Sequence, residues 1–208
     1  MGPSDPSQWW LGAAFVVGSF LVGSFNPAAV LATLKGADLR ASGSGNPGAT
    51  NAGRVLGARW GVLVAVLDVA KGFLPVWLAD TVGLDRFWVL LCGMAAVLGH
   101  MFSPFLRGRG GKGVATMLGA LLGVEPGYAL IAVVVVVVAL PVFRRMGLAA
   151  AFASAVLVCV GLADLGGLVG LADRLDGLWL VLLAALVGWR HRKNVVVGWR
   201  ARRAAGTT

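Results

Sequence analysis

Charged residues are scarce in this chain. They make up 13% of its 208 residues, whereas a soluble domain carries about 25%. Hydrophobic residues make up 58%, and uncharged runs such as residues 129–143 recur along the sequence. This pattern excludes an ordinary soluble domain and predicts an all-α polytopic membrane protein. A chain of this length has room for one helical bundle, so we expect a single domain over residues 1–208.

Cysteine and histidine are also scarce, with two of each. Both cysteines lie in apolar runs, which excludes a disulfide framework, and no Cys/His spacing is typical of a metal site. We therefore expect neither a metal nor a cofactor. A G-x-S-x-G elbow and the H-x-x-x-x-D pattern of the common glycerolipid acyltransferases are missing too. Residues 1–8 hold no Lys or Arg, so the start lacks the basic region of a secretory signal peptide.

Seven apolar segments predict a seven-span helical bundle. The fourth is too short to cross a membrane alone, because a span takes about 20 residues. Either its preceding loop dips into the membrane or the segment is not a true span. A dipping loop would face a wet, protein-lined cleft, since irregular backbone is tolerated at that depth only there. The segments are residues 9–31, 60–79, 87–106, 113–124, 127–143, 148–163 and 177–190.

Basic residues gather on alternate connections between these segments. The chain has 18 of them and a net charge of +9. If the N-terminus lies outside, most basic residues fall on cytoplasmic loops and most acidic residues fall outside. This asymmetry predicts a cytoplasmic C-terminus by the positive-inside rule. It also accounts for the charge without a nucleic-acid partner. A six-span version would move Arg144 and Arg145 outside and is disfavoured.

The first cytoplasmic loop is long and contains the run GSGNPGATN at residues 43–51. Loops commonly carry function. Ser44, Asn46 and Asn51 offer neutral hydrogen-bonding groups, and we expect Asn46 and Asn51 to contact a substrate phosphate. Arg54 offers a guanidinium suited to bidentate phosphate binding. The alternative is a surface loop made of turn-forming residues.

A second loop reads GRGGKG at residues 108–113 and leads into the fourth apolar segment. A glycine loop that feeds a helix exposes backbone N–H groups, and glycine lets a ligand approach them without Cβ clashes. It is not a Walker loop, because Gly113 follows Lys112 where Ser or Thr is required. The alternative is a flexible basic turn. The predicted phosphate cradle consists of Arg109, Gly110, Gly111, Lys112 and Gly113.

Three further polar groups stand out. A stop-transfer basic cluster explains the cations of the run RHRKN at residues 190–194, but not His191 or Asn194. Imidazole exchanges protons near neutral pH, so His191 is a candidate catalytic residue. Asp68 and Lys71 are spaced i,i+3 in the second segment, which predicts a structural ion pair inside the bundle. His100, at an interface, is expected to cap or pack.

These stretches resemble, in order and spacing, the motifs of one family, the bacterial membrane acyl-phosphate:glycerol-3-phosphate acyltransferases of the PlsY type. The resemblance implies a seven-span enzyme of the bacterial inner membrane with a cytoplasmic active site. It implies transfer of an acyl group from acyl phosphate to the 1-hydroxyl of glycerol 3-phosphate, giving lysophosphatidic acid. The matching stretches are LKGADLRASGSGNPGATNAGRVLG, GHMFSPFLRGRGGKGVAT, RHRKN and, for the family's second span, LDVAKGF.

Position by position, the resemblance assigns Ser44, Asn46 and Arg54 to the first motif. It assigns the glycine loop with Lys112 to the second motif, and His191 and Asn194 to the third. Acyl phosphate is an activated donor, so we expect direct attack by the glycerol hydroxyl, with positioning and electrostatics dominating. A Ser44–His191 acyl-enzyme route is the alternative, but no acidic third partner is evident. The family also suggests a peripheral, acyl-phosphate-producing enzyme as a partner on the basic face.

The chain departs from the family pattern at three places. Lys193 stands where the family usually has Glu, and residues 23–28 read GSFNPA rather than GSIPFG. After the dibasic pair Arg144-Arg145 the family tends to carry serine, but residues 147–150 read GLAA here. These departures leave open a divergent paralogue with a different acceptor or weak activity. An anion or phosphate transporter lined by the same loops is the alternative from another class, but polar groups cluster on one membrane face, which favours an interfacial enzyme.

Overall fold

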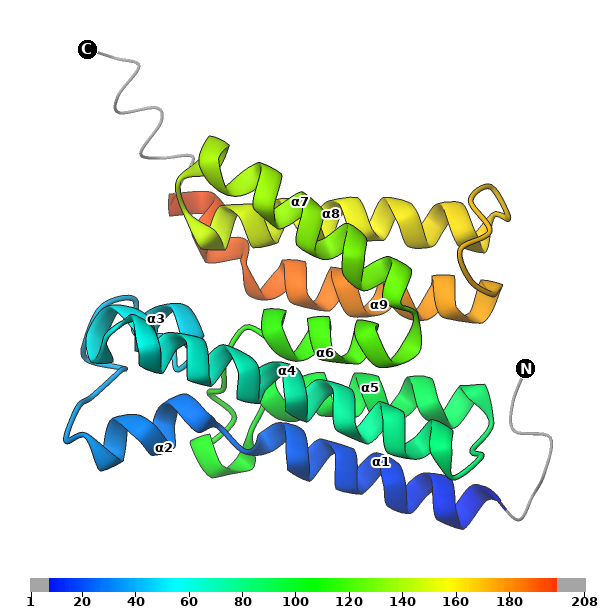
Figure 1. Ribbon diagram of the computed structural model, residues 1–208, viewed down its shortest axis with the longest axis horizontal. Coiled ribbons are helices and arrows are strands. Elements are labelled where there is room, and N and C mark those ends of the chain that lie inside the picture. Colours follow the sequence, from blue (N-terminus) through cyan, green and yellow to red (C-terminus); the bar gives the residue numbers. More distant parts are fainter. Residues whose placement is uncertain (1–7, 198–208) are drawn as a thin grey trace. The chain divides into compact units, whose positions relative to one another are not determined.

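The computed structural model describes residues 8–197, and every regular element in this range is a helix (Figure 1). The all-α prediction is therefore confirmed. The chain divides into two compact units, unit 1 (Met1–Pro126) and unit 2 (Gly127–Thr208). The single domain over residues 1–208 stays a prediction. The helices are α1 (Gln8–Ser24), α2 (Pro27–Leu34), α3 (Ala49–Leu56), α4 (Ala58–Thr81), α5 (Arg86–Met101), η1 (Pro104–Leu106), α6 (Val114–Val124), α7 (Pro126–Phe143), α8 (Met146–Leu165) and α9 (Arg174–Arg190).

All seven predicted apolar segments are helical, but they differ in length. α6 has 11 residues, which confirms the short fourth segment, and α9 has 17. Within residues 8–197, five stretches are long and apolar enough to cross a membrane. A multi-pass membrane protein is thus confirmed, while seven spans and their orientation stay predictions. The five stretches are Gln8–Leu34, Ala58–Thr81, Arg86–Leu106, Pro126–Phe143 and Met146–Leu165.

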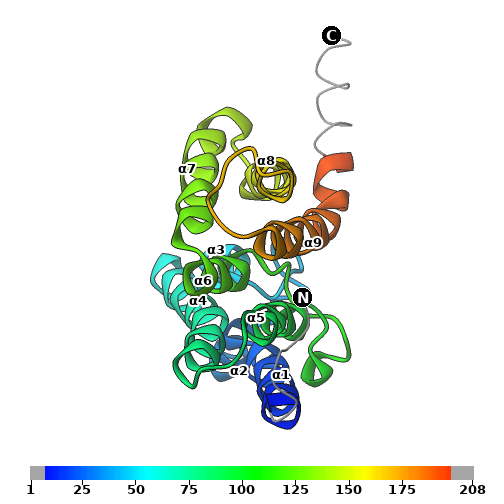
Figure 2. The ribbon, with the colours of Figure 1, turned by 90° about the vertical axis from the view of Figure 1, so that its right-hand side faces the viewer.

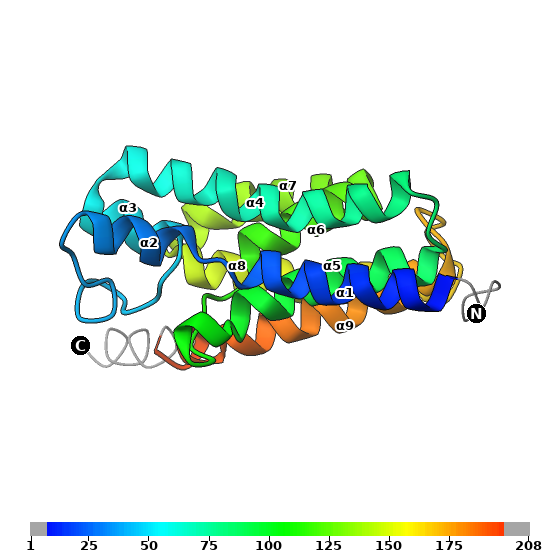
Figure 3. The same ribbon diagram turned by 90° about the horizontal axis from the view of Figure 1, so that it is seen from below.

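The first predicted segment, residues 9–31, lies within the candidate span Gln8–Leu34, but that span consists of two helices. The helix is interrupted at Phe25 and Asn26, and α2 then begins at Pro27 (Figure 3). The side-chain oxygen of Asn26 accepts the N–H of Ala29 at 2.8 Å, which caps the new helix. Proline suits the first helical position, because an N–H there would have no intrahelical acceptor and proline has no N–H. An asparagine–proline pair inside an apolar run therefore starts a second helix.

Helices of unit 1 approach one another at small residues. α4 packs against α3, α5 and α6, and α1 packs against α5 (Figure 2). A Cβ placed on Gly72 of α4 would collide with the carbonyl of Thr116, and one on Gly119 of α6 would collide with the carbonyl of Val69. α4 and α6 thus touch backbone to backbone. Such contacts drive helix association in lipid, where apolar burial gives no advantage.

The loop between α2 and α3, here called the first loop, rests on a small apolar core of its own. Leu39 lies in the loop, and the other members come from α2, α3 and α4. This core fixes the loop to three helices, so the loop backbone is held in place without a bound ligand. The buried members are Ala28, Ala32, Leu39, Ala52 and Val64.

Unit 2 is built on the pairing of α8 with α9. A Cβ on Gly161 would lie 2.7 Å from the carbonyl oxygen of Gly177, so these helices also meet at glycines. The buried carboxylate of Asp164 joins the start of α7 to the α8–α9 connection. Its Oδ2 accepts the hydroxyl of Tyr128 at 2.5 Å, and its Oδ1 accepts the N–H of Leu171 at 2.9 Å.

Candidate active site

Asn51 organises the first loop. Its side chain is 1% exposed. Nδ2 donates to the carbonyls of Leu39 at 2.9 Å and Ser42 at 3.0 Å, and Oδ1 accepts the N–H of Ser44 at 2.8 Å. Both ends of the amide are thus engaged inside the loop. This corrects the predicted direct contact with phosphate: Asn51 shapes the loop that carries the other candidates.

The remaining first-motif candidates are more accessible. Ser44 is exposed, Asn46 is half-buried, and Arg54 is exposed in the last turn of α3. Gly43 and Gly45 flank Ser44 with φ of +62° and +68°. These left-handed conformations suit glycine and bend the chain sharply around the serine. Ser44 and Asn46 therefore lie on a bent loop whose backbone is held by the side chain of Asn51.

The glycine loop folds back onto the end of α5. The N–H of Gly110 donates to the carbonyl of Met101 at 3.0 Å, and the N–H of Gly111 donates to the carbonyl of His100 at 3.1 Å. The last carbonyls of a helix lack intrahelical donors, and the N–H groups of this loop serve as their donors. The predicted phosphate cradle is therefore wrong for the amides of Gly110 and Gly111, because both N–H groups cap α5.

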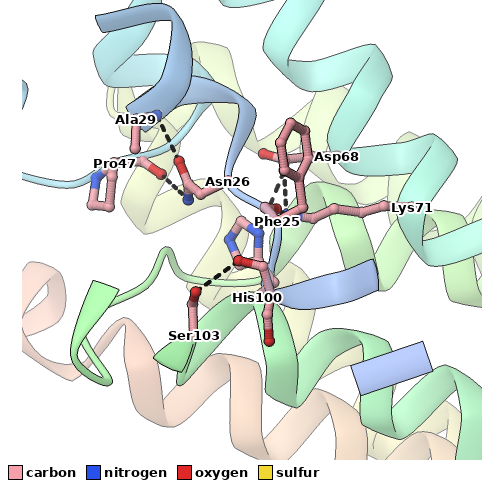
Figure 4. Close-up of polar contacts among 9 residues, drawn as sticks. Phe25, Asn26, Ala29, Pro47, Asp68, Lys71, His100 and Ser103 are labelled. Carbon is pink, nitrogen blue, oxygen red and sulfur yellow. Dashed lines mark hydrogen bonds and ion pairs between the residues drawn. The ribbon is translucent and has the colours of Figure 1, made fainter. Parts of the chain in front are cut away.

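His100 explains why position 111 is glycine. A Cβ on Gly111 would collide with Nε2 of His100, and one on Gly110 would collide with the carbonyl of His100. The imidazole is 4% exposed, and its Nδ1 lies 3.5 Å from Oδ1 of Asp68. His100 thus packs, as expected, but it packs between α4 and the glycine loop. Figure 4 shows its ring directed at Asp68 of α4.

The predicted ion pair of α4 is confirmed. Nζ of Lys71 lies 2.8 Å from Oδ1 of Asp68, and both side chains are buried. Lys71 also donates to the carbonyl of Phe25 at 2.6 Å, at the break between α1 and α2. This ammonium therefore serves two acceptors that lie far apart in the sequence, as Figure 4 shows.

The two loops are joined directly. Nη2 of Arg40 donates to the carbonyl of Arg109 at 2.5 Å, across 69 residues of sequence. Lys112 is half-buried at the end of the glycine loop, and Gly113 forms the N-cap of α6 with φ of +87°. The first amides of a helix have no intrahelical acceptor and carry positive partial charge. The anion-attracting end of this loop is therefore Lys112, Gly113 and the start of α6.

The third-motif candidates lie together in unit 2. His191 is 2% exposed, and its Nδ1 lies 2.9 Å from the carbonyl oxygen of Val187. A neutral imidazole that donates from Nδ1 carries its lone pair on Nε2, the nitrogen suited to accept a proton. The side chain of Asn194 occupies the space where Gly147 would carry a Cβ. Lys193 is exposed.

Sequence reasoning missed Asn26 and underestimated His100. Asn26 is 6% exposed and donates from Nδ2 to the carbonyl of Pro47 at 3.0 Å, so it reaches the first loop as well as capping α2. The Asn–Pro pair is a helix-start signal that could have revealed the break. No local signal connects His100 to Gly111, because the loop must first fold back.

Fold and site together define an integral membrane acyltransferase, as comparison with known proteins shows. The model of the family described as "Glycerol-3-phosphate acyltransferase" matches residues 13–199. The chain belongs to this family.

Two relatives from other bacteria match over most of their length. The "Glycerol-3-phosphate acyltransferase" of Geotalea daltonii is 40% identical over 181 residues, covering 86% of this chain and 90% of the relative. The "Glycerol-3-phosphate acyltransferase 1" of Deinococcus radiodurans is 42% identical over 179 residues, covering 85% of this chain and 86% of the relative.

Two solved structures share the fold. They are described as PlsY (YgiH), an integral membrane glycerol 3-phosphate acyltransferase. The glycerol 3-phosphate form has a TM-score of 0.83 and 36% identity, covering 92% of this chain and 94% of that one. The lysophosphatidic acid form has a TM-score of 0.81 and 35% identity, covering 92% and 93%.

Proposed function

We propose that this protein transfers an acyl group from acyl phosphate to the 1-hydroxyl of glycerol 3-phosphate, releasing inorganic phosphate and lysophosphatidic acid. The observation that carries the proposal is the extent of the family match. It covers residues 13–199 and so includes every candidate from Ser44 to Asn194. The similar structures described as glycerol 3-phosphate and lysophosphatidic acid forms support the same acceptor and product.

Phosphate recognition is assigned to cations and helix amides of unit 1. Lys112 precedes the N-terminus of α6, where backbone amides and the helix dipole attract anions. Arg54 and Arg109 are exposed and offer guanidinium groups that pair with phosphate oxygens. Asn46, half-buried in the first loop, adds a neutral donor and acceptor. Both substrates carry phosphate, and these groups suit either one.

The proposed chemistry is a direct displacement. The 1-oxygen of glycerol 3-phosphate attacks the acyl carbonyl carbon, a carbon–oxygen ester bond forms, and the carbon–oxygen bond to phosphate breaks. The departing phosphate carries away the electron pair and takes the hydroxyl proton, so no oxidant or covalent enzyme intermediate is needed. Rate enhancement then comes from orientation and from stabilisation of the charge that develops on the acyl oxygen.

Three residues are assigned to positioning the reacting groups. Ser44 is exposed on the bent first loop. Its hydroxyl is assigned to a hydrogen bond with the attacking hydroxyl of glycerol 3-phosphate. His191 is assigned to orienting a substrate through Nε2, which can accept a hydrogen bond when Nδ1 donates to the carbonyl of Val187. The amide of Asn194 offers both a donor and an acceptor. A Ser44–His191 acyl-enzyme is the competing route.

The donor is tested with purified protein in lipid nanodiscs. Labelled glycerol 3-phosphate is supplied with palmitoyl phosphate or with palmitoyl-CoA. We expect lysophosphatidic acid and inorganic phosphate in equal amounts with palmitoyl phosphate, and little product with palmitoyl-CoA. Product from palmitoyl-CoA alone would overturn the donor assignment. Passage of phosphate across vesicles without a donor would favour the transporter instead.

We also propose seven spans in the bacterial inner membrane, with the N-terminus outside and the active site facing the cytoplasm. The basic loops support this orientation, and they would face a peripheral enzyme that produces acyl phosphate. In a background with Cys92 and Cys159 replaced, an impermeant thiol reagent added outside should label Asp85→Cys. It should label Arg145→Cys only after the membrane is permeabilised. Outside labelling of Arg145→Cys would refute the topology.

A further inference from the structure

The break between α1 and α2 is fixed by neighbouring helices. A helix that ends leaves carbonyls without intrahelical partners, which must be satisfied inside a membrane protein. The carbonyl of Ser24 accepts the hydroxyl of Ser103 at 2.7 Å, and the carbonyl of Phe25 accepts the ammonium of Lys71 at 2.6 Å. The position that follows, Asn26, is therefore held in place by α4 and by the chain just after α5.

Asn26 uses both ends of its amide. Oδ1 accepts the N–H of Ala29 at 2.8 Å, and Nδ2 donates to the carbonyl of Pro47 at 3.0 Å across 21 residues (Figure 4). Capping α2 requires an oxygen alone, so serine or aspartate would serve equally well. The bond to Pro47 requires a donor as well. The bond to Pro47 in the first loop, and not the capping of α2, therefore explains why position 26 is asparagine.

Two asparagines hold the part of the first loop that contains candidate site residues. Asn51 holds the backbone of Ser44 from one side, and Asn26 holds Pro47 from the other. The intervening segment, residues 44–46, contains two of the candidate site residues. Buried side chain–backbone bonds of this kind fix a loop conformation before a ligand arrives.

We infer that Asn26 and Asn51 are positioning residues, which together hold residues 44–46 in the conformation that acts on substrate. The inference rests on the proposed function. It assigns a role to position 26, where this chain departs from the family's usual GSIPFG. Pre-organisation of this kind acts mainly on turnover, because a small displacement of a reacting group lowers the rate steeply.

The test separates capping from the loop contact. Asn26→Asp keeps the capping oxygen and loses the donor. Asn26→Ser also caps α2, remains neutral, and is too short to serve Ala29 and Pro47 together. We expect both variants to lower kcat by roughly 10- to 100-fold while the thermal unfolding temperature changes little. Amide hydrogen exchange at residues 44–46 should quicken, and exchange in α4 should not.

The matched control is Asp38→Asn. Oδ1 of Asp38 accepts the N–H groups of Arg40 and Ala41 within the same loop. The substitution retains that acceptor, so activity should stay at the parent level. Unchanged kcat in a folded Asn26→Ser protein would overturn the inference, and a loss confined to Asn26→Asp would mean that the new charge is responsible. A parent protein unable to acylate glycerol 3-phosphate would instead refute the proposed function.

Discussion

The two units hold their polar residues in different ways. In unit 1, buried bonds connect the ion pair of α4 to the α1–α2 break, and Asn26 connects that break to the first loop. In unit 2, His191 is held by a carbonyl one turn earlier in its own helix region. A change in unit 1 should therefore spread to both loops, whereas a change near His191 should act locally. The predictions below test this contrast.

The largest effect is expected from Asp68→Ala. It leaves the buried ammonium of Lys71 without its carboxylate, a change that costs about 3–5 kcal/mol in comparable pairs. We expect a large loss of folded protein and of unfolding free energy in mixed micelles. Asp80→Ala, at an exposed position of the same helix, should be nearly neutral. Equal stability of the two variants would show that unit 1 does not depend on this pair.

Gly111→Ala should come next. Its Cβ would push against the imidazole of His100 and move the glycine loop. We expect kcat/KM to fall by about 100-fold, the effect of displacing groups by roughly 1 Å. Gly18→Ala is the control, because a Cβ there meets no atom within 4 Å. Partial recovery in a Gly111→Ala/His100→Ser double variant would support the steric cause, while full activity of the single variant would contradict it.

Unit 2 is tested by Gly147→Ser, which introduces the residue type that the family tends to carry after the dibasic pair. The new Cβ would displace the side chain of Asn194, so we expect kcat to fall about tenfold without loss of stability. Gly166→Ala is the control, because its nearest contact is 3.4 Å. Steady-state kinetics and thermal unfolding separate the two effects. A fall in stability instead of kcat would make Gly147 a purely structural position.

Lys193→Glu should have the smallest effect. The side chain is exposed, and surface substitutions usually change free energies by less than about 0.5 kcal/mol, or roughly twofold in a rate or equilibrium constant. Activity should therefore stay close to that of the parent protein. A complete loss in a folded variant would show that Lys193 contacts substrate and that this chain recognises phosphate differently from its relatives.

Composition and apolar runs were enough to predict the apolar helices, because a membrane span must satisfy its own backbone hydrogen bonds. They did not predict α3, Ala49–Leu56, which lies where the sequence predicts a loop. They were not enough to predict the break at Asn26, which lies inside an apolar run. The carbonyls exposed there are satisfied by Lys71 of α4 and by Ser103 in the turn after α5. Spacing likewise identified the Asp68–Lys71 pair, since both residues share one helix.

The glycine loop shows where sequence reasoning ended. Its glycines were predicted to form a phosphate cradle, but the structure explains Gly110 and Gly111 by packing against His100 and by capping of α5. Those contacts exist only after the chain reverses direction. Asn51 was chosen for its amide, and the amide turned out to bind its own loop. Residue type alone does not tell whether a polar group faces a ligand or its own backbone.

The α1–α2 break also has a consequence for biogenesis. The ribosome makes residues 24–26 well before Lys71 and Ser103, whose side chains satisfy the carbonyls of Ser24 and Phe25. Until then these carbonyls need water. We expect the nascent first segment to wait at the membrane surface, or beside the insertion machinery, until α5 and the turn after it have been synthesised.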